Sequence, residues 1–272
     1  MNEGSQKPKT LSERAEKMGR VLGSGPRMSE EEKVAYLKEH MNLLRINVDF
    51  VSVETYRALF ASLDLEGKTV VNVGAGTAIG GSYNGMSPLM EALNSLDEKV
   101  VCIPLDYSHT RTKSWDLLDT DDPAKDGPVT LAPVTGDATA LPFADASIDG
   151  YVSANLINEP RKDESEVVFV KKLLAEAYRV LSPGGFIVLS SFGYFWWKTA
   201  DGKIVFNDLI DEEEIVSVAQ IERYLRDAGF TEIRPIPLDQ TEIQEVIAER
   251  RARKSDAVDT GVSEACAFFA RK

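Results

Sequence analysis

Residues 69–78 read TVVNVGAGTA, a β-branched run that ends in a glycine-rich turn. A short apolar run of this kind is typical of a buried strand, and glycines let the backbone turn sharply where a ligand approaches. Alone, the turn is a weak signal, because a plain tight connection between a strand and a helix has the same composition. The stretch therefore predicts a strand, a turn and a following helix, and leaves the role of the turn open.

Outward from this stretch, short apolar runs alternate with segments of helical period. The further predicted strands are residues 99–105, 129–134, 147–154, 186–192, 231–238 and 264–270. The predicted helices are residues 87–96, 108–118, 163–181, 217–228 and 240–252. Strands that alternate with helices indicate right-handed crossovers, so we expect an α/β fold with a doubly wound, mostly parallel sheet of seven strands.

The N-terminal part of the chain has a different pattern. Ser29 and Glu32 form a capping box that predicts a helix start, and apolar residues then recur at spacings of three and four. We expect residues 1–65 to form an N-terminal helical extension that caps the main body. Residues 66–272 would then form the domain that contains the sheet.

Composition limits the partners and the compartment. The 272 residues carry 44 Asp and Glu against 31 Lys and Arg, a formal net charge of −13, which argues against a nucleic-acid or anionic-membrane partner. No apolar run approaches the roughly 18 residues of a membrane span, and residues 1–10 have no signal-peptide core, so we expect a soluble, cytoplasmic protein. Cys102 and Cys266 lie in apolar runs and are expected to be buried free thiols, and no Cys/His cluster indicates a metal.

A second candidate for ligand binding lies where the strand after the glycine turn ends. In doubly wound sheets, ligands bind beyond the carboxyl ends of the strands. Asp106 could accept hydrogen bonds from two ribose hydroxyls there, and the next residue, Tyr107, could cover an adenine face. Asp106 follows Gly76 by 30 residues, more than the ~20 of the dinucleotide fingerprint, and the long loop at 79–87 accounts for the surplus.

Four segments in a fixed order are more specific than any one of them. They are VNVGAGTA (71–78), PLDYS (104–108), GDATALPFADASID (136–149) and AYRVLSPGGFIVLSS (177–191). With this order, the chain from about Gly67 to Gly193 resembles a class I S-adenosylmethionine-dependent methyltransferase. The resemblance implies a cofactor site formed by Gly74, Ala75, Gly76, Asp106, Tyr107, Asp137, Ala138 and Asn155.

The resemblance also implies a role for each of these residues. The turn at 74–76 would pass beneath the methionyl part of the cofactor, Asp106 would bind the ribose and Tyr107 would pack on the adenine. Asp137 would accept from the adenine amino group, with the Ala138 N–H near a ring nitrogen. Asn155 would line the place where cofactor and substrate meet.

The chain departs from the family pattern at three points. Asn72 stands where the family usually has an acidic residue, so it brings no charge to the cofactor's ammonium group. Ala78 replaces the third glycine of the motif, and the 79–87 loop is longer than usual. That loop could equally serve the substrate.

Catalytic candidates are few, because methyl transfer mainly requires alignment of an already activated donor. A general base is needed only when the acceptor must lose a proton. The candidates are Glu159, which follows the strand at 147–154, His109, near the expected cofactor edge, and His40, in the N-terminal extension. An ordinary surface or helix histidine remains the alternative for both histidines.

The sequence Tyr194–Trp197 has four consecutive aromatic residues in what we interpret as a connection. They could wall a pocket for an apolar or cationic substrate, or they could pack in the core or form a homodimer surface. The segment 199–203 is predicted to be a hairpin turn.

We therefore expect an enzyme that transfers a methyl group from S-adenosylmethionine to an N, O or S nucleophile of a small molecule by in-line displacement. Two alternatives stay open. One is a dinucleotide-dependent oxidoreductase, and the other is an S-adenosylmethionine-binding protein with lost or altered chemistry. The identity of the acceptor has no recognisable signature in the sequence.

Overall fold

The computed structural model describes residues 51–75, 88–108, 128–157, 164–191, 193–206, 216–253 and 258–272. The predicted capping box at 29–32, the loop at 79–87 and the predicted helix at 108–118 lie outside these residues. Within the described ranges, no helix combines the length and the apolarity needed to cross a membrane.

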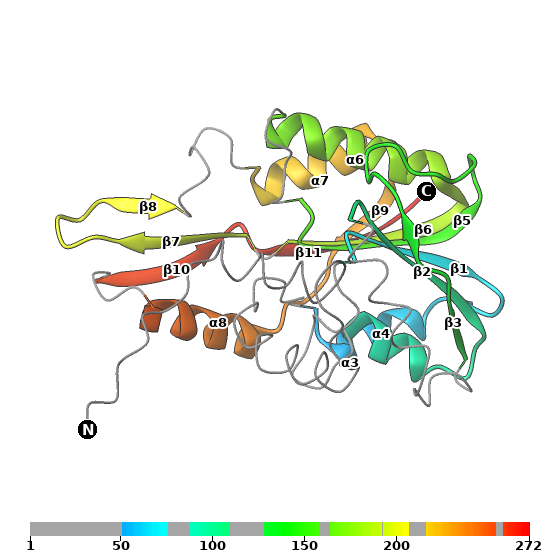
Figure 1. Cartoon of the computed structure of the whole chain (residues 1–272), viewed down its shortest axis with the longest axis horizontal. Helices are drawn as coiled ribbons and strands as arrows, with labels where there is room; N and C mark the ends of the chain where they lie inside the picture. Colours follow the sequence, from blue (N-terminus) through cyan, green and yellow to red (C-terminus); the bar gives the residue numbers. More distant parts are fainter. Residues whose placement is uncertain are drawn as a thin grey trace, which may run out of the picture. The chain divides into compact units, whose positions relative to one another are not determined.

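The main sheet has the predicted doubly wound architecture (Figure 1). Its strand order is β3-β2-β1-β5-β6-β11-β9, with β4 also paired to β2. The pairs are parallel except for β11, which runs antiparallel to both β6 and β9. The strands are β1 (Thr69–Val73), β2 (Val100–Asp106), β3 (Val129–Leu131), β4 (Val134–Thr135), β5 (Ile148–Ala154), β6 (Leu181–Ser191), β9 (Thr231–Pro235) and β11 (Cys266–Arg271).

All seven predicted strands are present, and one of them is divided. The predicted strand at 129–134 forms β3 and β4, so eight strands occupy the seven expected positions. Pro133 lies at the break, where it can donate no backbone hydrogen bond to the ladder.

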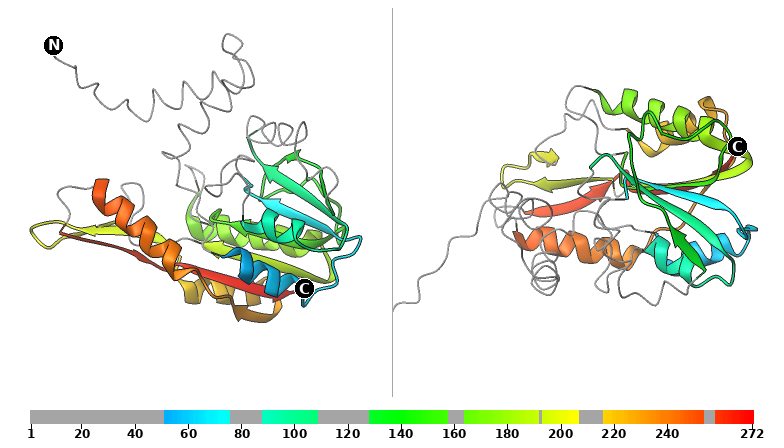
Figure 2. Two further views of the ribbon diagram at one scale, coloured as in Figure 1. Left: turned by 90° about the horizontal axis from the view of Figure 1, so that it is seen from below. Right: turned by 45° about the vertical axis from the view of Figure 1, so that its right-hand side comes forward.

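Helices cover both faces of this sheet. Figure 1 shows α6 (Glu166–Val180) and α7 (Val218–Asp227) on one face and α3 (Val53–Phe60) and α4 (Pro88–Asn94) on the other. The rotated view in Figure 2 shows the same layers, with α8 (Gln240–Arg253) beyond α4 on the same side.

The helix α3 lies within the predicted N-terminal extension and belongs to the core. Tyr56 and Phe60 are fully buried, and the Phe60 ring lies 6.3 Å from that of Phe186 in β6. Residues 1–50 lie outside the described ranges, so the helical cap and the boundary at residue 65 stay predictions.

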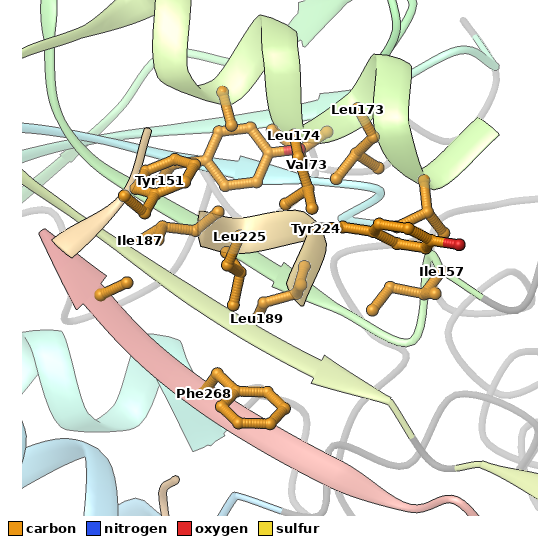
Figure 3. Packing of buried hydrophobic residues seen from close by; sticks show 14 of the residues in the cluster. Val73, Tyr151, Ile157, Leu173, Leu174, Ile187, Leu189, Tyr224, Leu225 and Phe268 are labelled. Carbon is orange, nitrogen blue, oxygen red and sulfur yellow. The ribbon is translucent and has the colours of Figure 1, made fainter. Parts of the chain in front are cut away.

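The sheet is buried on both faces, which explains its nearly continuous apolar runs. Figure 3 shows the cluster beneath α6 and α7, where Tyr151 and Ile187 from the sheet meet Leu173 and Leu174. Neighbouring positions point the other way, so Phe186 and Val188 pack in a second cluster beneath α3 and α4.

The structure also has a second, antiparallel sheet, which was not predicted from the sequence. Its order is β10-β7-β8, with β7 at Tyr194–Lys198, β8 at Ile204–Phe206 and β10 at Asp259–Ser263. The aromatic segment interpreted as a connection is therefore a strand, paired with β10 on one side and β8 on the other. The predicted turn at 199–203 is confirmed as the β7–β8 hairpin, closed by a 2.9 Å hydrogen bond from the Thr199 N–H to the Lys203 carbonyl.

The two cysteines give a test of the packing. Both are buried and free, as predicted, and burial raises the pKa of each thiol to about 12. Because the thiolate is the nucleophile, we expect neither to react with iodoacetamide in the native protein at pH 8. Mass spectrometry should find two modified cysteines after denaturation, and rapid labelling of the native protein would contradict the burial of these strands.

Candidate functional site

The carboxyl ends of four neighbouring strands meet at one edge of the main sheet. Val73 of β1 is in register with Leu105 of β2, and Asp106 is in register with Thr135 of β4. On the other side, Asn72 of β1 is in register with Val152 of β5. This pairing brings the glycine turn, the end of β2, the segment after β4 and the end of β5 to the same edge.

Backbone hydrogen bonds across this edge fix the start of the glycine turn. The N–H groups of Gly74 and Ala75 both donate to the Leu105 carbonyl, at 2.8 and 3.0 Å. Gly74 has φ +73°, and a Cβ there would lie 3.1 Å from the Leu156 side chain. A side chain at this position would therefore be both strained by the left-handed backbone and crowded by Leu156. Gly76 lies outside the described residues.

Asp106 is held at the end of β2. It is 2% exposed, and its carboxylate Oδ1 accepts from the Ser108 N–H at 2.9 Å. Its carbonyl accepts from the Gly136 N–H at 3.0 Å, which joins β2 to the segment that contains Asp137. Tyr107, the next residue, is 70% exposed and offers its ring to the surface at this edge.

Asp137 has a fixed orientation because Thr139 binds it twice. Its carboxylate Oδ1 accepts from both the backbone N–H and the hydroxyl of Thr139, each at 2.9 Å. Its carbonyl accepts from the Ala140 N–H at 3.0 Å. Ala138, between them, is half-buried and packs against the core cluster beneath α6.

The segment after Asp137 is tied to α6 by one guanidinium group. Arg179 donates to the carbonyls of Leu141 and Phe143, at 3.1 and 2.9 Å, and to the Asp145 carboxylate at 2.7 Å. It also binds both carboxylate oxygens of Glu176, at 2.9 and 2.8 Å. Hydrogen bonding to Arg179 lowers the pKa of Glu176, whose carboxylate also accepts from the Leu141 N–H.

Asn155 ends β5 in a left-handed conformation, with φ +63°. Its backbone N–H donates to the Ser190 carbonyl of β6 at 2.8 Å, and the residue is 4% exposed. Asparagine tolerates this conformation better than most residues do. The backbone alone therefore favours asparagine at position 155, whether or not its side chain contacts a ligand.

Three serines at the same edge are not among the predicted site residues. Ser153 of β5 and Ser190 and Ser191 of β6 are buried, and the Ser153 hydroxyl has no hydrogen-bond partner within the described residues. A signal is present in the sequence, because these serines lie near the carboxyl ends of two otherwise apolar runs. The Ser191 hydroxyl accepts from the Gly193 N–H at 3.0 Å, which helps to fix the turn that follows β6.

The three catalytic candidates, Glu159, His109 and His40, lie outside the described residues. Among the residues that are described, no group of three His, Cys, Asp or Glu side chains comes together as metal ligands would.

Comparison with solved structures defines the class of this fold. The structure superposes on phosphoethanolamine N-methyltransferase 2 of Haemonchus contortus, solved with S-adenosyl-L-methionine, with a TM-score of 0.53 at 17% identity. The match covers 87% of this chain and 57% of that one. A second structure of that enzyme, with phosphomonomethylethanolamine and S-adenosylhomocysteine, gives a TM-score of 0.50. The fold is therefore the Rossmann-like fold of class I methyltransferases.

Sequence comparison agrees with the fold. Residues 85–189 match the family model described as "Methyltransferase domain", a range that includes Asp106, Asp137 and Asn155 and begins after Gly74. Residues 85–189 thus match a methyltransferase domain, and the fold that contains them is the one that class I methyltransferases have.

Two curated relatives show how far the likeness extends. A malonyl-[acyl-carrier protein] O-methyltransferase of Methylococcus capsulatus is 29% identical over 174 residues, which is 61% of this chain and 52% of that protein. A ubiquinone/menaquinone biosynthesis C-methyltransferase of Paracoccus denitrificans is 48% identical over 63 residues, 23% of this chain and 22% of that protein. The chain thus matches about half or less of the length of these relatives.

We expect Asp106→Asn to weaken S-adenosylmethionine binding about 10- to 100-fold, because the neutral amide is a weaker acceptor for hydroxyl groups than the carboxylate. Isothermal calorimetry would measure the dissociation constant. Asp227→Asn, the same change at an exposed position at the end of α7, is the control and should leave the affinity unchanged. Equal affinities for both variants would remove Asp106 from the site.

The pair Glu176 and Arg179 predicts a pH effect on stability. The folded state lowers the pKa of Glu176, so its contribution is complete at neutral pH and is lost as pH falls through the folded-state pKa, below its ordinary value of about 4.3. We expect Glu176→Gln to lower the free energy of unfolding at pH 7 by about 1 kcal/mol and to reduce its loss in acid. Urea unfolding at pH 7 and pH 4 would measure both, and an unchanged acid response would contradict this role.

Proposed function

We propose that the protein transfers the methyl group of S-adenosylmethionine to a small-molecule acceptor by in-line displacement. The observation that carries this proposal is the common edge of β1, β2, β4 and β5, where Gly74, Asp106, Asp137 and Asn155 follow the carboxyl ends of neighbouring strands. The family model matches residues 85–189, so the activity of the whole protein is part of the proposal.

The residues at this edge fit the cofactor chemically. Gly74 permits the left-handed turn that ends β1, and Asp106 and Asp137 are oriented carboxylates that suit hydroxyl and amino donors. When bound, the cofactor supplies a methyl group already activated by a sulfonium. The chain would then bind the nucleoside through these carboxylates, align the acceptor and exclude water.

The acceptor and the residues that bind it are less well defined than the cofactor site. The relatives' names include an O-methyltransferase acting on malonyl-[acyl-carrier protein] and a quinone-pathway C-methyltransferase, so they support a biosynthetic acceptor without agreeing on the atom. We propose an N, O or S nucleophile. Glu159, His109 and His40 remain the proposed bases for an acceptor that must lose a proton.

One observation favours the alternative of a cofactor-binding protein without transfer. Asn72 is buried in β1 and brings no charge to the place where the family usually has an acid. A methyltransferase would then need another anchor for the cofactor's ammonium group. The oxidoreductase alternative gains no support from the family match.

Two experiments test the proposal. Calorimetry should show binding of S-adenosylmethionine and S-adenosylhomocysteine and none of NADH or NADPH; the reverse pattern would overturn it. Incubation with methyl-labelled S-adenosylmethionine and pooled metabolite fractions should give a labelled small molecule. Binding without transfer to any fraction would favour the alternative in which chemistry is lost.

A further inference from the structure

A buried pair of side chains lies just beyond the edge that holds the candidate cofactor residues. Tyr194, the first residue of β7, is 2% exposed, and its hydroxyl donates to the Glu166 carboxylate in the first turn of α6. Glu166 is 1% exposed. The Tyr194 oxygen also accepts from the Val216 N–H, at 3.1 Å, just before α7. One phenol thus joins β7 to the starts of two helices.

The second sheet joins the main sheet through two residues with left-handed backbones, close to this pair. Gly193 turns the chain from β6 into β7 with φ +71°, and Glu264 turns it from β10 into β11 with φ +58°. A Cβ on Gly193 would lie 2.0 Å from the Ser263 carbonyl oxygen, so the two turns touch. Figures 1 and 2 show β7 and β10 continuing outward together from β6 and β11.

A second carboxylate, that of Glu264, anchors the connection between β10 and β11. Glu264 accepts from the Val218 N–H at 2.6 Å, in the first turn of α7. The Tyr194 hydroxyl, itself bound to Glu166, and the Glu264 carboxylate thus tie the second sheet to residues 216–218 at the start of α7.

The pair lies on the half of the edge away from the nucleoside residues. Ala154 at the end of β5 is in register with Ser190 of β6, and Tyr194 follows four residues later. Asp106 and Asp137 follow β2 and β4, on the opposite side of β1. A change at Tyr194 should therefore alter the acceptor side and leave the nucleoside side intact.

Burying a carboxylate is expensive, so its partner has to be well placed. The helix dipole at the start of α6 reduces the cost, and the Tyr194 hydroxyl supplies a charge-assisted hydrogen bond. Such a bond is short and directional, so it fixes the position of β7 more tightly than apolar packing would.

From this geometry we propose that Glu166 and Tyr194 are a positioning pair that holds β7, the continuation of β6, as a wall of the acceptor-binding region. The proposal rests on the proposed methyl transfer. It assigns β7 to acceptor binding, with the Trp196 indole, which lies over Gly261 of β10, as an aromatic surface for an apolar or cationic acceptor. In-line transfer is sensitive to displacements of about 1 Å, so loosening β7 should weaken acceptor use.

The test compares Tyr194→Phe with Tyr224→Phe, the same change at another buried tyrosine, in α7. Two of the three tryptophans, Trp196 and Trp197, lie in β7, so tryptophan fluorescence reports on this strand. Tyr194→Phe should raise the acrylamide quenching constant about twofold and leave the calorimetric affinity for S-adenosylhomocysteine within about twofold. Tyr224→Phe should change neither.

Kinetics with the acceptor found by methyl labelling complete the test. Tyr194→Phe should raise KM for the acceptor about tenfold with kcat within about threefold. Glu166→Gln, whose amide oxygen can still accept from the phenol, should lie closer to the wild type than Glu166→Ala.

Three outcomes would overturn the proposal: unchanged quenching, an equal effect of Tyr224→Phe, or parallel losses of cofactor and acceptor affinity. Failure of the proposed function has a different signature, because the unaltered protein would then bind no S-adenosylhomocysteine. The quenching comparison would still decide whether the pair holds β7.

Discussion

The parallel pairing of β1 with β2 on one side and with β5 on the other determines where every described cofactor candidate lies. Because the strands run in one direction, their carboxyl ends and the turns that follow meet at one edge. A slip of one residue in β2 would turn Asp106 to the other face of the sheet and separate it from the glycine turn. The two apolar clusters oppose such a slip, because it would also expose alternate residues of β2.

Much of this arrangement could be predicted from the sequence, for identifiable physical reasons. β-Branched runs between helical periods locate the parallel strands, and strand ends locate the ligand edge, so the sequence pattern alone points to Asp106 and Asp137. The start of β6 is harder to predict. The segment 182–185, SPGG, has the composition of a turn, yet the structure includes it in the strand that begins at Leu181.

The second sheet could not be predicted for a different reason. Four adjacent aromatics in β7 show no alternation, and β10 reads DTGVS, a run with little hydrophobic character. Each becomes a strand through pairing with the other, across the long stretch of chain between Lys198 and Asp259. Long-range pairing of this kind leaves little trace in local composition, and neither do the hydrogen bonds of Glu166 and Glu264.

The position of β11 has a consequence for how the chain folds during synthesis. This strand follows all others of the main sheet in sequence, yet it lies between β6 and β9 and is antiparallel to both. Until residues 266–271 have left the ribosome, β9 has no neighbour in the sheet and β6 presents an open edge of unpaired backbone. The parallel half, from β3 to β6, can pair earlier, so the nascent chain has a partly formed sheet with β6 at its open edge until β11 is made.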